Sequence, residues 1–298
     1  MSARRLALLG AIPALLMCLE SASAFTMWLT EGRTNRVYLL GSVHLLRQSD
    51  YPLPVVIERA YADADTLVME LDMDDLDPVN MQATINRLGV LPAGKTLEDV
   101  LGPDQYQEVS TRAADLDVPL ELLARSEPWL AAITIEQLVL TRLGFDPRFG
   151  VEMKLAGLAG VDQKSIEGLE TVDEQLGLLD GLSDDAQRDL LMQTLEEGSE
   201  IATLMDAMIA AWRSGDVEHL ESTMLVELAD YPELYRTIVA DRNGRWMQSL
   251  EAMLEDDRDY LIVVGALHLV GEDGLPEQLR NAGYEVTQLE GDATLPAD

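Results

Sequence analysis

Histidine is rare in this chain, and two of its three copies lie in the same local pattern. His44 belongs to VYLLGSVHLL and His268 to LIVVGALHLV, so each ends a Gly-x-x-His motif that follows a hydrophobic run. Imidazole binds metals and exchanges protons near neutral pH. Two copies in one setting therefore indicate a shared catalytic or metal site. The third copy, His219, lies in a polar stretch typical of a helix surface.

The elements before the two histidines read as buried strands. Residues 37–40 and 261–264 are short, apolar and partly β-branched. Gly41 and Gly265 are expected to let the chain turn where a side chain would clash, so each histidine emerges past the C-terminal end of its strand. Open α/β sheets bind ligands at that edge. One such motif alone is more often structural, but two of them, about 220 residues apart, suggest that the fold brings them together.

A carboxylate is expected at the same edge. Residues 66–71 form a third apolar run that ends in MELD, which offers Glu70 and, as a weaker second candidate, Asp72. Two imidazoles and a carboxylate suit zinc, manganese or iron with positions open to water, and such a metal favours hydrolysis. Without a metal, the same groups could act as a general base and an oxyanion stabiliser. Strand-end acids are often merely solvated, so Glu70 could equally be a surface residue.

The rest of the chain indicates the fold. Strands are predicted at residues 26–29 and 36–40, then a helix to about residue 64 and a parallel strand at 66–71. Apolar spacings of three and four predict helices at residues 103–116, 129–143, 151–158, 171–179, 186–197, 201–212 and 245–254, with one short strand around 162–166. A strand at 259–264, a helix from 271 to about 281 and a strand from 283 follow.

We therefore predict the α/β (α+β) class, with a mixed central sheet from the N- and C-terminal thirds. The large helical middle, about residues 81–254, would be an insert or cap in a single domain of residues 25–298. Methionines recur along the predicted helices, and such stripes are usually core packing. They are Met192, Met205, Met208, Met224, Met247 and Met253.

The first 24 residues are typical of a secretory signal peptide. Arg4 and Arg5 precede an apolar stretch and a final Ala-Ser-Ala. We expect export to the periplasm or the extracellular space, with no stable membrane insertion after cleavage; the alternative is an uncleaved anchor. The only cysteine, Cys18, lies in this segment, so the mature chain would have no disulfide, zinc–thiolate site or thiol nucleophile. Catalysis would then depend on oxygen and imidazole groups.

The charge of the chain excludes one class of partner. It has 54 acidic and 21 basic residues, a net charge of −33. Such a protein repels phosphate backbones and anionic lipid surfaces, so nucleic-acid binding is disfavoured. The apolar content of 47% is ample for a folded core.

Several segments together resemble the TraB/GumN family, which is related to the Tiki proteins. They are GSVH, GALH, VMELD, IEGLETVDEQ at residues 166–175 and DRNGRWM at residues 241–247, and their order spans nearly all the mature chain. The resemblance implies a metal-dependent protease with His44, Glu70 and His268 at its active centre. It also places Arg242 and Asn243 near that centre. Glu170 and Gln175 would be supporting polar groups.

Arg242 could hold a substrate carboxylate or orient Glu70 by a bidentate contact. We therefore predict a secreted or periplasmic metal-dependent hydrolase, above all a peptidase, acting on a peptide or small-molecule substrate. Its cofactor would be a divalent metal, Mn, Co or Zn, bound by His44, Glu70 and His268. Two alternatives stay open. One is a haem- or ligand-binding protein, with two histidine ligands and a methionine-rich pocket. The other is a metal-independent small-molecule esterase.

Overall fold

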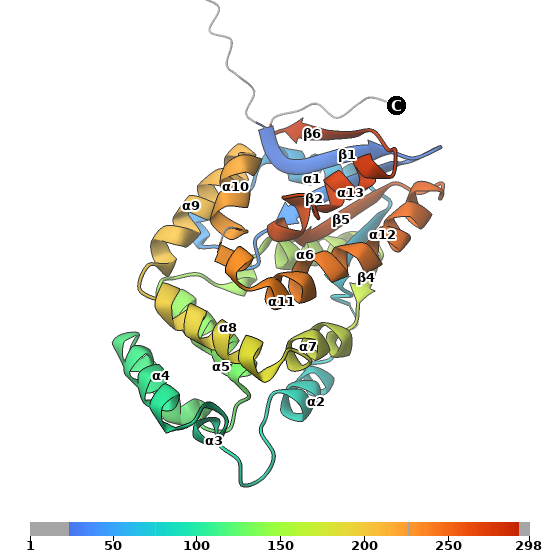
Figure 1. Ribbon diagram of the computed structural model, residues 1–298. Helices are drawn as coiled ribbons and strands as arrows, with labels where there is room; N and C mark the ends of the chain where they lie inside the picture. Colours follow the sequence, from blue (N-terminus) through green and yellow to red (C-terminus); the bar gives the residue numbers. More distant parts are fainter. Residues whose placement is uncertain (1–23, 75, 226, 292–298) are drawn as a thin grey trace, which may run out of the picture.

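A six-stranded mixed sheet lies at the centre of the protein. The computed structural model describes residues 24–74, 76–225 and 227–291 (Figure 1). The strand order is β4-β3-β5-β2-β1-β6, in which β1 runs antiparallel to its neighbours β2 and β6, whereas β2, β5, β3 and β4 are parallel. The strands are β1 (Ala24–Glu31), β2 (Arg36–Ser42), β3 (Thr66–Leu71), β4 (Ile166–Glu170), β5 (Tyr260–Gly265) and β6 (Val286–Glu290).

The predicted fold class is confirmed, and the two histidine-bearing strands are neighbours. In the parallel pair β2–β5, Gly41 lies opposite Val264 and Ser42 opposite Gly265. Both strands are buried along almost their whole length, which explains why their sequences are continuous apolar runs. The two Gly-x-x-His motifs therefore leave the sheet side by side. The predicted signal peptide lies outside the described residues, except that Ala24 is the first residue of β1.

Helices cover both faces of the sheet. Successive strand residues point to opposite sides, so Leu40 packs in one core and Leu39 in the other. The Leu40 face is covered by α1 (Val55–Asp63), α6 (Val151–Asp162), α9 (Ile201–Ser214) and α10 (Val217–Met224). The Leu39 face is covered by α12 (Asp241–Leu254) and α13 (Leu275–Asn281), which contribute Trp246, Leu250 and Leu279.

A helical lobe extends from the sheet and has its own core. It contains α3 (Leu97–Leu101), α4 (Pro103–Asp115), α5 (Pro128–Arg142) and α8 (Asp184–Glu197). The remaining helices are α2 (Pro78–Leu88), α7 (Val172–Asp180) and α11 (Pro232–Tyr235). The middle range 81–254 also supplies β4, α6 and α12 to the sheet layers, so it is not wholly a cap. Within the described ranges, none of the helices has the length and apolarity that crossing a membrane needs.

Two element boundaries differ in ways that matter. The strand predicted around residues 162–166 was wrong, because α6 continues to Asp162 and ends at Gln163 in the left-handed conformation (φ 57°); the strand starts only at Ile166. The helix predicted from residue 245 starts at Asp241, directly after a π-helical turn, η5 (Arg236–Ala240). Arg242 and Asn243 therefore lie on a packed helix, and π-turns often mark functional sites.

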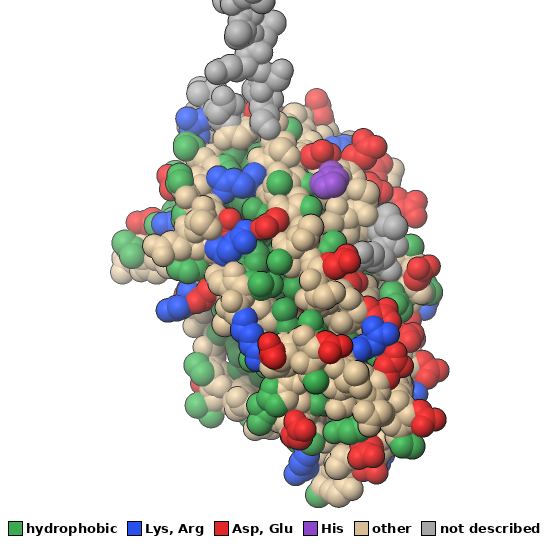
Figure 2. Space-filling view, turned by 90° about the vertical axis from the view of Figure 1, so that its left-hand side faces the viewer, with side chains coloured by type: hydrophobic (Ala, Val, Ile, Leu, Met, Phe, Trp, Pro, Cys, Tyr) green, Lys and Arg blue, Asp and Glu red, His purple; other side chains and the backbone are tan. Residues whose placement is uncertain are grey.

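Acidic side chains are spread over the surface. In the face that Figure 2 shows, Asp and Glu side chains are scattered over many elements and outnumber Lys and Arg. His219 lies exposed on α10, as predicted. The charge excess is therefore a general property of this face and does not by itself indicate a binding patch.

The start of α6 is coupled to the backbone of His44. A Cβ on Gly150 would lie 2.9 Å from the His44 carbonyl carbon, whereas a Cβ on Gly157 in the same helix would meet nothing within 4 Å. We expect Gly150→Ala to lower the free energy of unfolding by about 1–3 kcal/mol through overpacking. Gly157→Ala should raise it by roughly 0.8–1 kcal/mol. Urea denaturation measures both, and equal stability of the two variants would contradict this close approach.

Candidate active site

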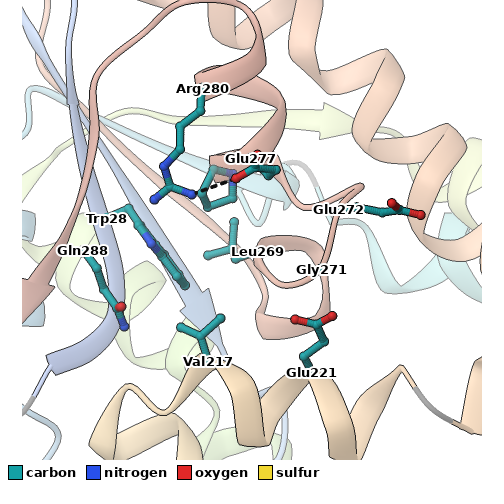
Figure 3. Close-up of a pocket in the computed structure, with 10 residues that line it drawn as sticks. Trp28, Val217, Glu221, Leu269, Gly271, Glu272, Glu277, Arg280 and Gln288 are labelled. Atoms are coloured by element: carbon teal, nitrogen blue, oxygen red, sulfur yellow. Dashed lines mark hydrogen bonds and ion pairs between the residues drawn. The ribbon is translucent and has the colours of Figure 1, made fainter.

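Two cavities meet at the predicted residues, and a third does not. His44 and Glu70 line both a cavity of about 340 Å³ and one of about 300 Å³. Arg242, Gly265 and His268 line the second of these. A separate cavity of about 410 Å³ lies between α10, α13 and β1, where Arg280 and Glu277 form an ion pair of 3.2 Å (Figure 3). None of the predicted residues lines that third cavity.

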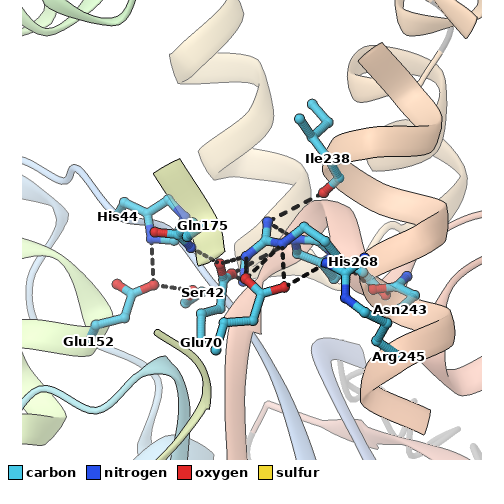
Figure 4. A network of polar contacts seen from close by, with 12 residues as sticks. Ser42, His44, Glu70, Glu152, Gln175, Ile238, Asn243, Arg245 and His268 are labelled. Atoms are coloured by element: carbon cyan, nitrogen blue, oxygen red, sulfur yellow. Dashed lines mark hydrogen bonds and ion pairs between the residues drawn. The ribbon is translucent and has the colours of Figure 1, made fainter. Parts of the chain in front are cut away.

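The three predicted metal ligands surround Gly265. A Cβ built on Gly265 would lie 3.3 Å from His44 Nε2, 3.4 Å from Glu70 Oε1 and 3.7 Å from His268 Cδ2. The Gly265 amide donates a hydrogen bond of 2.7 Å to Glu70 Oε1. The structure thus brings His44, Glu70 and His268 together at the C-terminal ends of β2, β3 and β5 (Figure 4).

The chain turns at Gly265, where β5 ends and a 3-10 helix follows, but not at Gly41, and neither glycine is needed for a special backbone conformation. Gly41 lies inside β2 without a positive φ, and Gly265 has φ −50° and ψ 138°, which any residue adopts. A Cβ on Gly41 would lie 2.7 Å from the Thr26 side chain. The glycines are therefore needed for space: Gly41 for packing and Gly265 for the three site side chains.

His44 is held by Glu152, a residue that the sequence did not single out. His44 Nδ1 lies 2.6 Å from Glu152 Oε1 at the start of α6, and the Ser42 hydroxyl donates to the same oxygen. The charge of Glu152 raises the pKa of His44 to about 9, although burial opposes this. Because Nδ1 is taken, Nε2 is the nitrogen that faces Gly265.

His268 is buried and held in one tautomer. It lies in η6 (Ala266–Leu269), is 4% exposed, and packs against the Trp246 ring with centroids 4.5 Å apart. Asn243 Nδ2 donates to the carbonyls of His268 (3.1 Å) and Asp273 (2.7 Å), so Asn243 Oδ1, 2.8 Å from His268 Nδ1, accepts. Nε2 then carries a lone pair. Burial lowers the pKa of His268 to about 3, so this ring is neutral.

Arg242 connects the acidic and basic groups of the site. Its Nη2 lies 2.5 Å from Glu70 Oε2 and 2.9 Å from Glu170 Oε2, and its Nε lies 3.2 and 3.1 Å from the two Glu170 oxygens. Its Nη1 lies 3.0 Å from His268 Nε2. The forked contact therefore goes to Glu170, while Glu70 receives a single contact from Arg242 and another, 3.1 Å, from Gln175 Nε2.

These contacts keep Glu70 ionised. Burial would raise the pKa of Glu70. The opposing influences are the charge that His268 carries when it is protonated, the permanent charge of Arg242 and the charge of His44, and together they lower the pKa to about 2. Arg242 and Glu170 are each 7% exposed. A buried carboxylate without a cation would be costly, so Glu70 requires Arg242, which also pairs with Glu170.

One predicted residue lies apart, and several contributors were missed. Asp72 caps its own loop, with Oδ1 accepting a 3.0 Å hydrogen bond from the Asp74 amide, and makes none of the contacts described above. Arg245 was not singled out, and its Nη2 donates to Glu170 at 3.1 Å. Glu152 could not be found by its pattern, because an acid in the first turn of a helix is common for electrostatic reasons. Trp246 lay within the DRNGRWM segment.

The donor chemistry fits a divalent metal. The Nδ1 atoms of the two imidazoles are fixed by a carboxylate and an amide, next to an ionised Glu70; His268 Nε2 has a lone pair, whereas His44 would release its Nε2 proton on binding a metal. Their present positions do not form a metal site, since no group of three or more His, Cys, Asp or Glu in the described part of the chain is arranged to hold an ion. Arg242 explains this, because its guanidinium contacts Glu70 and His268 Nε2. A metal on these ligands would have to replace it there.

Comparison with known proteins identifies the family to which this fold and site belong. The model of the TraB/PrgY/gumN family matches residues 26–288, so the chain belongs to this family. Uncharacterized protein YbaP of Escherichia coli (strain K12) is 27% identical over 82% of this chain and 87% of YbaP. Metalloprotease TIKI1 is 21% identical in Danio rerio and 23% in Homo sapiens, over 84% of this chain but about 60% and 59% of those proteins. No solved structure matches.

The protonation states of the three histidines can be resolved by NMR. In chelator-treated protein, we expect the His44 ring to titrate with a pKa of about 9, because Glu152 stabilises its charged form. In Glu152→Gln this pKa should fall towards 6.5, the ordinary value for a histidine side chain. His268 should stay neutral above pH 5.

The raised pKa of His44 also determines how the stability of the protein depends on pH. His44 contributes stability fully below pH 6.5, and the contribution is lost as the pH rises through about 9. The measurement is the pH dependence of the ring Hε1 and Cε1 shifts, with exposed His219 as internal reference. An unchanged His44 titration in Glu152→Gln would contradict the contact.

Proposed function

We propose that this protein is an exported metal-dependent hydrolase that cleaves peptide bonds, with His44, Glu70 and His268 binding a Mn, Co or Zn ion. The observation that carries this proposal is the convergence of His44 Nε2, the Glu70 carboxylate and the His268 ring around Gly265, with His268 Nε2 3.9 Å from Glu70 Oε1. The name metalloprotease for relatives in the same family supports peptide substrates. Water would add across the amide bond and yield a carboxylate and an amine.

The side chains of the protein have distinct roles in this proposal. A bound divalent metal would supply Lewis acidity and a more acidic water. Glu152 and Asn243 hold the two imidazoles by Nδ1, so that His44 Nε2 faces Gly265 and His268 Nε2 faces Arg242. Arg242 is anchored to Glu170 through Nε and Nη2, so its planar guanidinium would tilt as one unit from Glu70 and His268 to the substrate carbonyl. There the guanidinium would stabilise the developing oxyanion.

The ligand set is tested by metal titration, with the third histidine as a control. We expect the chelator-treated chain to bind one equivalent of Mn, Co or Zn in calorimetry. His44→Ala, His268→Ala and Glu70→Gln should weaken this at least about 100-fold, because each removes a ligand whose supporting contacts alone are worth 10–100-fold. Exposed His219→Ala should bind like the wild type. The same variants should show the same order in the hydrolysis of fluorogenic peptides, with activity lost to chelator and restored by metal.

Other outcomes would replace the proposal. No metal binding by the wild type would exclude a metal-dependent enzyme. Ester hydrolysis that is insensitive to chelator would favour the metal-free esterase. A Soret band on adding haem, lost in both His44→Ala and His268→Ala, would favour the haem-binding alternative.

The competition between Arg242 and a metal gives a separate prediction. Arg242→Gln should lower the free energy of unfolding at pH 7 by about 3–5 kcal/mol, because Glu70 stays buried without its cation and Glu170 keeps only half-exposed Arg245. Added metal should then raise the melting temperature more in Arg242→Gln than in the wild type, since the ion no longer displaces a guanidinium. Arg245→Gln is the control, because half-exposed Arg245 contacts only Glu170 among the site acids. An equal metal-induced shift in wild type and Arg242→Gln would contradict the competition.

A further inference from the structure

A methionine-lined cavity opens from the candidate active site towards the helical lobe. The cavity of about 300 Å³ has His44, Arg242 and His268 on one side and Met205, Met208 and Met224 on the other. The methionines come from α9 and α10 and are only partly buried, because they pack on the core with one side and face the cavity with the other. The same three methionines continue into an adjoining cavity of about 270 Å³.

Glu136 on α5 stands where the two cavities join. It lines both of them and is accessible to solvent from the cavity. Among the residues that the structure describes, no side chain or backbone group forms a hydrogen bond or ion pair with its carboxylate. The surrounding protein nevertheless raises its pKa by desolvation.

The nearby charges are already committed to other partners. His44 is paired with Glu152, and Arg242 is shared among Glu170, Glu70 and His268. Glu136 is therefore an ionisable group in a largely apolar cavity, where the charge of His44 acts on it only without contact and does not offset its desolvation. An unpaired carboxylate in such surroundings favours a cation from outside, where a charge-assisted hydrogen bond is strong.

We infer that this cavity is a subsite for an apolar chain that carries an ammonium group, with the methionines contacting the chain and Glu136 pairing with the ammonium. Flexible, polarisable methionine side chains adapt to unbranched chains of different shape. The inference rests on the proposed function. If the protein cleaves peptides, the subsite would accept either an N-terminal ammonium beside an apolar side chain or a lysine side chain. Both sources share the same chemistry.

Binding of n-hexylammonium tests this without any turnover. Titration into protein labelled with ¹³C at the methionine methyl groups should shift the signals of Met205, Met208 and Met224, which single Met→Leu variants assign. Glu136→Gln should weaken binding about tenfold or more, because a hydrogen bond to a charged group contributes roughly 1.5–3 kcal/mol. Wild type should bind 1-hexanol and hexanoate more weakly by a similar factor.

Glu251→Gln on α12 is the matched control for the general acidity of the surface, since it removes one exposed carboxylate outside the cavity. It should bind n-hexylammonium like the wild type. Equal affinity of wild type for n-hexylammonium and 1-hexanol would overturn the inference, and so would unchanged binding by Glu136→Gln. Because the first comparison uses only wild type, it holds even if a variant fails to fold.

Peptides distinguish the two ammonium sources. If wild type hydrolyses peptides, Glu136→Gln should lower kcat/KM about tenfold for a free N-terminal Met peptide but not for its acetylated form, when the source is the α-amino group. When the source is a lysine side chain, Glu136→Gln should instead lower kcat/KM for acetylated peptides that contain lysine and not for acetylated peptides without it. If no peptide is cleaved, the proposed function fails while the n-hexylammonium titration still decides the subsite.

Discussion

The buried guanidinium of Arg242 is the interaction on which the site depends. Glu70 at the end of β3 and Glu170 at the end of β4 are both largely enclosed, and burying a carboxylate is costly without a cation beside it. Arg242 supplies it because α12 is fixed to the sheet by Trp246 and Leu250, and its guanidinium also lies 4.6 Å from the Trp246 ring. The strand order that places β3 between β4 and β5 therefore also sets the charge balance.

That balance limits what the site can bind. Glu70 and His268 Nε2 already share one cation, so a second cation can occupy the same place only if the guanidinium moves. Glu170 favours such a movement, because it can keep Arg242 paired through Nε, and Arg245 gives Glu170 a second cation partner. In the proposed enzyme, binding of a metal would exchange one positive charge beside Glu70 for another.

Much of this arrangement could be predicted from local patterns, and the rest depends on tertiary contacts. The continuous apolar runs before His44 and His268 marked buried parallel strands, and this placed Glu70 at their common edge. Glu152 gave no usable signal, because only the packing of α6 against the His44 backbone brings it to the ring. The role of Gly265 was misread for the same reason: its conformation is ordinary, and the crowding around it comes from β2 and β3.

The methionines show how one sequence pattern can serve two purposes. Met205, Met208 and Met224 have the helical spacing of core residues and do pack on the core, yet their outer sides line the cavity beside the site. On the other side of His44 and Glu70, the cavity of about 340 Å³ is lined by Met69, Leu71 and Met73. An extended peptide in the proposed enzyme would cross the shared residues with an apolar wall on either side. Glu136, present on one side only, would then fix the direction in which the peptide lies.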